Sequence, residues 1–500
     1  MASSHITPGV NIEDQNAFPN PVVAVQTEVP VFIGYTDIAE RNGESLARKA
    51  VRITSIAEYS AFFGKGFKSK FVIADSEPNQ KEVTFTIDKT EKVLKFKENN
   101  TFYLYHAIRL FYANGGASAY IISIGTYRDK PDGFEISAGD IIGSDGKPGA
   151  LDFLLNEPEP TLVLIPDAIS LGEDCYSTIY TRVLAHCQQV QSRFAIFDLV
   201  QPLAADQTDI IVASFRDNIG INALNYGAAY YPWLKTTIIE ANEIDFENID
   251  PTTDLGALLP EEGAKDAVSR FKQKTDPDDK DKRNYHLSLK ANSSTYVRIL
   301  EEVKNKLNEL PPSGAMAGIY TMVDSTGGVW KAPANVSLSM VSAPSVNISN
   351  EEQEKLNIDE ISGKSINVIR LFSGIGTLVW GARTLDGNSQ DWRYINVRRT
   401  LIMIEQSLKL AARMYVFEPN DANTWATIKS MFNNFLFNLW KQGALAGAVP
   451  EQAFSVAVGL GETISPGDII NGIMMITVLV AVVHPSEFIV LTFEQQMQQS

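Results

Sequence analysis

Two segments of this chain resemble nucleotide-binding motifs in residue type and spacing, but each lacks a glycine that its motif requires. Gly363, Lys364 and Ser365 form the ending of a phosphate-binding loop, but Ile358 stands where that loop needs its first glycine. Without this glycine the backbone does not turn several N–H groups toward a phosphate. A nearby pair of glycines, GIG at 374–376, lacks the third glycine of a dinucleotide-binding turn and predicts a tight turn between strands. We therefore expect no nucleotide cofactor.

Residues that could bind a metal or act as a nucleophile are also scattered. None of the histidines has a second metal ligand at helical or hairpin spacing. Cys187 directly follows His186 in a predicted helix, so the two side chains point in different directions. No Gly-x-Ser-x-Gly turn is present, and carboxylate pairs are assembled in space without a sequence signature. The sequence thus predicts no catalytic residue, no metal site and no enzyme. The histidines are His5, His106, His186, His286 and His484.

Composition narrows the class of protein. The chain has 500 residues, 44% of them hydrophobic and 21% charged, which is the balance of a folded protein with two or three domains. Its formal net charge is -17 and it has no run of Lys or Arg, so we expect neither nucleic acid nor anionic membranes as partners. Two cysteines, Cys175 and Cys187, are too few for a disulfide framework, and the N-terminus shows no secretory signal pattern. These features favour assembly in the cytoplasm.

One of the most apolar stretches nearly closes this acidic chain, from Ile473 to Phe493. Its longest apolar run ends at Val483 and has eleven residues, whereas a membrane-spanning helix needs roughly 20. The run is rich in β-branched residues, and Pro485 lies in a turn-like segment after it. We therefore predict two strands around a turn and no membrane insertion. Either the subunit itself or another copy of the chain must cover these strands.

Local patterns predict an α+β chain with mixed α/β topology. The first twenty residues are predicted to form an extended arm, and a strand follows over 22–34. Residues 161–200 have the order strand, helix, strand, which is typical of a parallel βαβ unit. A hairpin is predicted around Asp88 to Thr90, and the acidic segment 240–285 is predicted to be a solvated loop.

Five of the six tryptophans lie between Trp330 and Trp440, so the best-packed domain is predicted in this last part of the chain. Two amphipathic helices are predicted on either side of Asp421, which should cap the second helix, and Gly443 should end it. Basic residues gather near the first helix. They predict either a solvated face that pairs locally with Glu405 or a contact surface for an acidic partner. These basic residues are Arg393, Arg398, Arg399, Lys409 and Arg413.

Longer motifs carry a resemblance to a known family. In chain order they are TPGVNIED (7–14), VRITSIAEYSAFFG (51–64), ANGGASAYII (113–122), YGAAYYPWLKT (226–236), PPSGAMAGIYTMVDSTGGVWKAPAN (311–335), VWGARTL (379–385), WRYINVRRT (392–400), VFEPND (416–421) and LWKQGALAGAVPEQAF (439–454). Together they closely resemble contractile tail sheath proteins, the family of phage tails, R-type bacteriocins and extracellular contractile injection systems. The resemblance covers nearly the whole chain apart from the predicted hairpin and the acidic segment.

The resemblance implies a multi-domain structural subunit. Such subunits stack as rings around an inner tube in an extended, high-energy state, and they contract when a baseplate triggers them, which drives the tube through a target envelope. The implied partners are other copies of the chain, the inner tube protein, the baseplate, and terminator or cap proteins. The implied domains are an N-terminal arm (1–21), the first part of an inner domain (22–125, with a hairpin insertion at about 78–98), an inserted outer α/β domain (126–310), a C-terminal inner sheath domain (311–483) and a C-terminal arm strand (484–500).

The resemblance also implies that neighbouring subunits exchange terminal strands, which would answer how the apolar C-terminal stretch is covered. The donated strands would be Val10, Asn11, Ile12 and Glu13 at one end and Phe488, Ile489, Val490, Leu491, Thr492 and Phe493 at the other. The receiving sheet would use Ile473, Met475, Thr477, Leu479 and Ala481. Contacts with the tube or with other subunits would use Arg393, Arg398, Arg399, Lys409 and Lys441.

Two alternatives remain open at this stage. One is the large sheath component of a type VI secretion system, although the strand-forming TPGVNIED segment begins a self-contained chain here. The other is a cytosolic α/β enzyme built on the βαβ unit at 161–200. The enzyme would be a monomer or small oligomer with a pocket, whereas a sheath would form rings or filaments.

Overall fold

The computed structural model describes residues 21–77, 84–99, 101–144, 146–201 and 207–488. These residues divide into two compact units. The larger unit comprises residues 26–402 and the segment that begins at His484, and the smaller unit comprises the segment that ends at Val25 and residues 403–483. One helix, α13 (Ile395–Ala412), contributes residues to both units.

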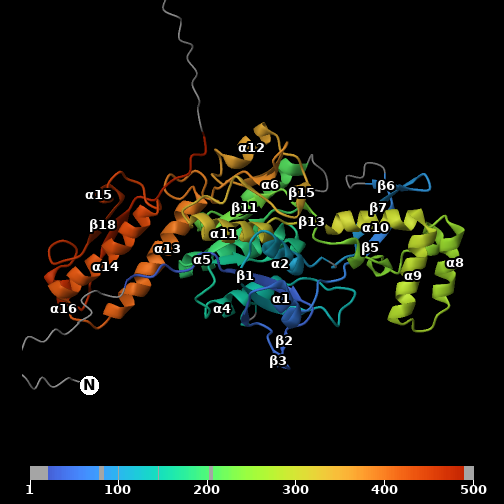
Figure 1. Ribbon diagram of the computed structural model, residues 1–500, viewed down its shortest axis with the longest axis horizontal. Helices are drawn as coiled ribbons and strands as arrows, with labels where there is room; N and C mark the ends of the chain where they lie inside the picture. Colours follow the sequence, from blue (N-terminus) through green and yellow to red (C-terminus); the bar gives the residue numbers. More distant parts are fainter. Residues whose placement is uncertain (1–20, 78–83, 100, 145, 202–206, 489–500) are drawn as a thin grey trace, which may run out of the picture. The chain divides into compact units, whose positions relative to one another are not determined.

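A nine-stranded sheet forms the centre of the larger unit (Figure 1). The middle strands, from β16 to β8, run parallel to one another. Antiparallel strands complete both edges. The order across the sheet is β14 (Val336–Ser337), β17 (Gly376–Val379), β16 (Asn367–Phe372), β11 (Gly227–Tyr231), β10 (Phe194–Asp198), β9 (Leu162–Leu164), β1 (Pro30–Thr36), β8 (Ala119–Thr126) and β4 (Ala50–Ile53).

Burial explains why the middle strands are continuous apolar runs. β1, β9, β10 and β11 are buried at every residue, as expected for parallel strands covered on both faces. The predicted βαβ unit is confirmed, because β9 and β10 pair in parallel and α5 (Thr181–Val190) lies between them in the chain. The strand predicted over 22–34 is shorter than expected and starts only at Pro30.

Two buried carboxylates connect strand ends to helix starts. Asp167 follows β9 and accepts hydrogen bonds from the backbone N–H groups of Tyr35 (2.7 Å), Tyr103 (2.6 Å) and Leu104 (2.9 Å), and so caps α2 (Leu104–Ala113). Asp198 ends β10 and accepts from the backbone N–H (2.7 Å) and the hydroxyl (2.5 Å) of Ser313, the first residue of α11 (Ser313–Gly327). These hydrogen bonds satisfy N–H groups at the helix starts that have no partner within the helix, so each carboxyl group fixes a helix to the sheet.

Close packing of α11 on α2 explains the small residues of the GAMAG segment. A Cβ atom added at Gly314 would lie 2.4 Å from the carbonyl oxygen of Ala107. One added at Gly318 would lie 2.5 Å from the carbonyl oxygen of Phe111. Glycine at both positions therefore allows the two helix backbones to approach each other.

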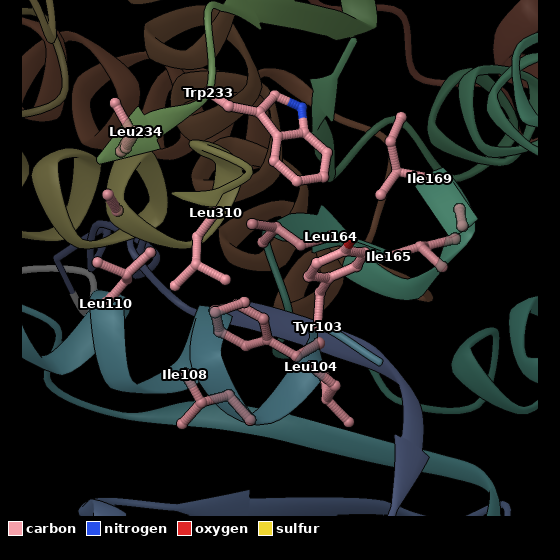
Figure 2. Packing of buried hydrophobic residues seen from close by; sticks show 14 of the residues in the cluster. Tyr103, Leu104, Ile108, Leu110, Leu164, Ile165, Ile169, Trp233, Leu234 and Leu310 are labelled. Atoms are coloured by element: carbon pink, nitrogen blue, oxygen red, sulfur yellow. The ribbon is translucent and has the colours of Figure 1, made fainter. Parts of the chain in front are cut away.

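The main hydrophobic core lies in the larger unit and extends from Val29 to Ile402. Figure 2 shows part of it, where Tyr103 and Trp233 lie among apolar side chains from several elements. The rings of Tyr103 and Trp233 meet edge to face with centroids 5.3 Å apart, and the Trp233 indole N–H donates to the carbonyl of Leu199. The prediction that the best-packed domain lies among the last five tryptophans is wrong, because Trp233 is the only tryptophan among the described residues that is buried.

The acidic segment 240–285 is largely helical, so the prediction of a solvated loop is wrong. It contains α7 (Leu255–Leu258), α8 (Glu262–Lys272) and the first half of α9 (Asp279–Asn292). Phe246, Phe271 and Tyr285 hold these elements together, and the rings of Phe271 and Tyr285 stack 4.0 Å apart. Charged residues cover the outside of a small aromatic core.

The predicted hairpin is confirmed. β6 (Thr84–Ile87) and β7 (Thr90–Phe96) pair antiparallel through a two-residue turn in which Asp88 and Lys89 both have positive φ. β5 (Phe71–Asp75) pairs with the other edge of β7 and extends the hairpin to three strands.

The remaining elements of the larger unit surround the main sheet. The strands are β2 (Glu40–Arg41), β3 (Glu44–Ser45), β12 (Leu234–Thr236), β13 (Glu309–Leu310) and β15 (Val341–Pro344). The helices are α1 (Ile56–Phe63), α3 (Ala138–Ile142), α4 (Ala150–Leu154), α6 (Thr208–Asn218), α10 (Ser294–Leu307) and α12 (Asn350–Asn357).

The smaller unit is built on one long helix, α14 (Ala422–Lys441). Asp421 caps it as predicted, since its carboxylate accepts from the N–H groups of Asn423 (3.0 Å) and Thr424 (3.1 Å). Gly443 follows its end with φ +84°. The other elements of the unit are α15 (Pro450–Ala453), β18 (Phe454–Ala457), α16 (Pro466–Ile470) and β19 (Thr477–Val480).

Both cysteines are unpaired and fully buried. Burial raises the pKa of the Cys175 thiol and of the Cys187 thiol to about 12. Within the described ranges, no helix is long and apolar enough to cross a membrane.

The mixed α/β fold class is confirmed. The observed division into units differs from the predicted domain boundaries at 126 and 311, because the nine-stranded sheet takes strands from both sides of each boundary. The predicted terminal arms lie mostly outside the described residues.

Burial of Asp198 and Asp167 predicts a pH dependence of stability. Desolvation raises the pKa of Asp198 to about 7 and that of Asp167 to about 6, while their hydrogen bonds act in the opposite direction. A raised folded-state pKa means that the folded state binds the extra proton, so stability falls as the pH rises from about 4 to 7. Asp198→Asn should reduce the loss of unfolding free energy between pH 5 and pH 7 by up to roughly 3 kcal/mol. Denaturant unfolding at several pH values measures this.

The matched control is Asp129→Asn, which removes the carboxylate of an exposed residue. It should leave the pH profile of the parent chain unchanged. An equal slope in the Asp198→Asn variant and the parent would contradict the assignment.

Candidate assembly surfaces

The smaller unit contains a two-stranded sheet, and the segment that follows its second strand pairs with residues 444–446 through a bridge between Leu445 and Val482. β18 and β19 pair antiparallel, with Phe454 opposite Val480 and Ala457 opposite Thr477. Within the part of the chain that the structure describes, neither strand pairs with a third strand. α14 and β18 pack together. Main-chain donors and acceptors at an open strand edge can pair with a strand from another chain.

The segment that contains β19 carries an outward-facing apolar row. Exposure alternates along it, as it does for a strand with one face covered. The outward-facing residues are those predicted for the receiving sheet: Ile473 (46% exposed), Met475 (51%), Thr477, Leu479 (63%) and Ala481. We call these five residues the apolar row.

Exposed apolar side chains concentrate in the smaller unit more generally. Among the described residues, half of the large apolar side chains that are exposed belong to this unit, although it is much the smaller of the two. Contiguous exposed apolar surface marks interaction sites in soluble proteins. The smaller unit is therefore the better candidate for contacts between molecules.

Arg399 is not a surface residue, which corrects its proposed contact role. Its side chain is 3% exposed and forms a bidentate pair with Asp324, itself 2% exposed, at 2.9 and 2.5 Å. Arg399 also donates to the carbonyl of Thr27 (3.0 Å), and the Thr27 hydroxyl donates to Asp324 (2.6 Å). Burial raises the pKa of Asp324, and Arg399 opposes this shift. The arginine thus joins α13, α11 and the segment at Thr27.

Arg398 is also buried, so it does not lie on the surface as the predicted contact with the tube or another subunit requires. It donates to the Tyr226 hydroxyl (2.5 Å), and its guanidinium lies 4.3 Å from the Tyr226 ring centroid and 4.8 Å from that of Trp392. Arg393 is half-buried. Only Lys409 and Lys441 of the proposed contact residues are exposed, and Lys441 lies over the Phe437 ring at 4.5 Å.

The predicted donated strands lie almost entirely outside the described residues. These are Val10, Asn11, Ile12 and Glu13, and Ile489, Val490, Leu491, Thr492 and Phe493. Phe488 is described, and its side chain is 69% exposed.

Glu487 attaches the start of the C-terminal segment to the larger unit. Arg383, with 3% of its side chain exposed, donates to the Glu487 carboxylate at 2.7, 3.0 and 3.2 Å. Asn357 (2.7 Å) and the Tyr394 hydroxyl (3.1 Å) donate to it as well. Burial alone would raise the pKa of Glu487, but the hydrogen bonds from Arg383 and Asn357 lower it. We call this arrangement the Glu487 clamp.

The nucleotide-like segment at Gly363 has a structural role. The buried Lys364 donates its ammonium hydrogen bond to the carbonyl of Arg216, and the Ser365 hydroxyl donates to the carbonyl of Asn357 (2.5 Å). Both side chains are therefore occupied within the fold. In the described part of the chain, no group of three or more His, Cys, Asp or Glu residues is arranged to hold a metal ion.

A cavity of about 860 Å³ lies in the larger unit, where the enzyme alternative would need a pocket. Aromatic side chains, including Phe67, Phe246 and Phe271, line it. Charged residues of its wall pair with each other, as in Lys68 with Glu247 (2.7 Å) and Arg128 with Asp37 (2.6 Å). These ion pairs use the groups that acid–base chemistry would need.

Comparisons with known proteins identify the class. Residues 388–496 match the family described as the phage tail sheath C-terminal domain. The chain is 26% identical over 186 residues to the tail sheath protein of Vibrio phage KVP40, which covers 36% of this chain and 26% of that protein. It is 27% identical over 157 residues to the tail sheath protein of Salmonella phage ViI, covering 31% and 24%. The chain thus spans about a quarter of the length of these curated relatives.

Solved structures match along the whole chain. The PVC sheath complex of an extracellular contractile injection system, in its contracted state, is 27% identical with a TM-score of 0.60, and the match covers 99% of both chains. The contracted helical sheath of the anti-feeding prophage is 28% identical with a TM-score of 0.61, covering 99% of this chain and 100% of that one. The predicted resemblance is therefore confirmed, because the chain is similar to contractile tail sheath proteins along its length.

The Glu487 clamp makes a prediction about stability. Glu487→Ala would leave the Arg383 guanidinium buried without a charged partner, so the larger unit should lose roughly 3 kcal/mol of unfolding free energy at pH 7. Because the pKa of Glu487 is lowered, this contribution should disappear as the pH falls below about 4. Denaturant unfolding measures the loss, and hydrogen exchange at 484–488 reports release of the segment.

Glu462→Ala is the matched control. Its pair with Lys429 is exposed on both sides and 3.6 Å long, so the loss should stay below about 1 kcal/mol. Equal effects of the two variants would show that the clamp is no stronger than a surface ion pair.

Proposed function

We propose that this chain is the structural subunit of a contractile sheath. Copies polymerise helically around an inner tube in a metastable extended state and contract to drive the tube through a target envelope. The observation that carries the proposal is the exposed apolar row on the β18–β19 sheet, which no third named strand of the described residues extends. It lies within residues 388–496, the range that matches the sheath C-terminal domain.

Strand exchange would link the neighbours. The segments Val10–Glu13 and Phe488–Phe493 would be donated to the β18–β19 sheet of adjacent copies, and the apolar row would be covered in the assembly. Main-chain hydrogen bonds provide most of the affinity in such strand addition, so the link tolerates changes in the angle between subunits. The Glu487 clamp supports this assignment, because it gives the C-terminal strand a fixed starting point.

The role is structural rather than catalytic. Contraction needs no nucleotide if energy is stored at assembly, because two packings of the same interface can differ by a few kcal/mol. Summed over many subunits, this difference becomes large mechanical work. The occupied Lys364 and Ser365 side chains are consistent with a chain that binds no phosphate.

The proposed partners are other copies, the inner tube protein, the baseplate, and terminator or cap proteins. A baseplate complex of the anti-feeding prophage contains a relative 28% identical to this chain, which supports the baseplate as a partner. Lys409 and Lys441 are proposed contacts with the tube or with other subunits. Assembly would take place in the cytoplasm, and the product would be a phage tail or a released tail-like particle.

Truncation tests the strand exchange. A chain that ends at Phe488 keeps the Glu487 clamp but loses the rest of the proposed donated strand. We expect the full chain, with its tube protein as template, to form hollow cylinders in negative-stain electron microscopy, and the truncated chain to stay dispersed.

A chain that ends at Phe493 is the control, because it lacks only the last seven residues and should assemble. If the chain ending at Phe488 also forms cylinders, the C-terminal strand is not the link. If the full chain stays in small particles with the tube present, the sheath function itself is wrong.

A further inference from the structure

The loop between α13 and α14 presents one aromatic side chain entirely to solvent. Phe417 is 102% exposed and has a backbone φ of +73°. Left-handed backbone is uncommon for residues other than glycine and is an outlier for a bulky side chain. The isolated chain therefore accepts an unfavourable backbone and an uncovered ring at the same residue. Strain of this kind concentrates where it serves a contact.

The loop is held firmly, so the position of the ring is defined. The N–H of Glu418 donates to the carbonyl of Tyr415 (3.2 Å). After Phe417 in the sequence, the Asn420 side chain accepts a hydrogen bond from the Trp425 indole N–H (2.7 Å). The Asn420 amide in turn donates to the carbonyl of Ile473 (3.0 Å). Because Ile473 begins the apolar row, the loop is tied directly to the proposed receiving surface.

The exposed residues that lie near Phe417 in the sequence are mostly apolar or basic. Met414 is 50% exposed and Val416 is 60% exposed, and both adjoin the ring in sequence. Lys409 and Arg413 precede them and are exposed, and Glu418 follows. A partner must therefore supply an apolar recess with acidic residues beside it.

We propose that Phe417 is an anchor that inserts into an apolar recess of an adjacent copy of this chain, with Lys409 and Arg413 facing that copy's acidic surface. A second copy offers acidic side chains for these two cations, since the chain has 60 Asp and Glu residues against 43 Lys and Arg residues. Aromatic side chains are the usual anchors of protein interfaces. The inference rests on the proposed sheath function and extends the subunit contact from the apolar row to the loop.

Two substitutions distinguish the effect of losing the Phe417 ring from the effect of relieving its unfavourable backbone conformation. Phe417→Gly removes the ring and suits the left-handed φ, so the melting temperature of the unassembled chain should be unchanged or higher. Phe417→Ala removes the ring but keeps the unfavourable backbone. Both variants should raise the concentration needed for assembly about tenfold or more. Light scattering and electron microscopy measure assembly.

Ile361→Ala is the control, since Ile361 is a 98% exposed apolar residue of the larger unit. It should assemble as the parent chain does. If the parent and the control assemble and Phe417→Gly assembles at the same concentration, the anchor is wrong while the sheath function stands. If the parent itself fails to assemble with its tube protein, the sheath function fails first.

Photo-crosslinking identifies the partner whose recess receives Phe417. A chain with p-benzoylphenylalanine at position 417, irradiated in assembled particles, should give a covalent dimer of this chain. A crosslink to the inner tube protein, or no crosslink in intact particles, would overturn the proposal that a second copy receives the ring.

Discussion

The buried pair of Arg399 and Asp324 is the interaction on which the packing of α13 within the larger unit depends. It joins α13 to α11, and it holds the backbone of Thr27 as well. Thr27 lies two residues after the chain leaves the smaller unit at Val25, and Arg399 lies shortly before the chain enters that unit again at Met403. Removing either charged partner would leave the other buried and unpaired, which is strongly destabilising. The third passage of the chain, at His484, is secured by Arg383 and Glu487 in the same way.

The larger unit therefore contains the contacts that make the fold rigid, and the smaller unit contains the exposed apolar surface. In the larger unit, Asp167 and Asp198 fasten helices to the ends of parallel strands, and glycines bring α2 and α11 close together. The smaller unit keeps its apolar row and the loop at Phe417 uncovered. A subunit that must hold neighbours while the lattice rearranges benefits from this division, because the contacts can change without unfolding the body.

Local signals in the sequence predicted the parts of the fold that local physics decides. The hairpin turn at Asp88, the cap at Asp421 and the βαβ unit each depend on residues close together in the chain, and all three are confirmed. The residues of the apolar row were implied by the resemblance, and they are exposed in the structure, although their partner remains a proposal. What failed depended on distant residues. Arg399 meets Asp324 75 residues away, and the acidic segment folds around Phe246, Phe271 and Tyr285, whose spacing has no simple period. Tryptophan size indicated burial but not position.

The two buried thiols have a consequence for a polymer of many copies. Disulfide exchange needs an accessible thiolate, and Cys175 and Cys187 offer neither exposure nor ionisation near neutral pH. In the proposed sheath, crowded neighbours would therefore not become joined by disulfides when a particle meets air or an oxidising fluid. Links between copies in the proposed sheath would then contain no disulfide, so an ageing lattice would keep its ability to slide.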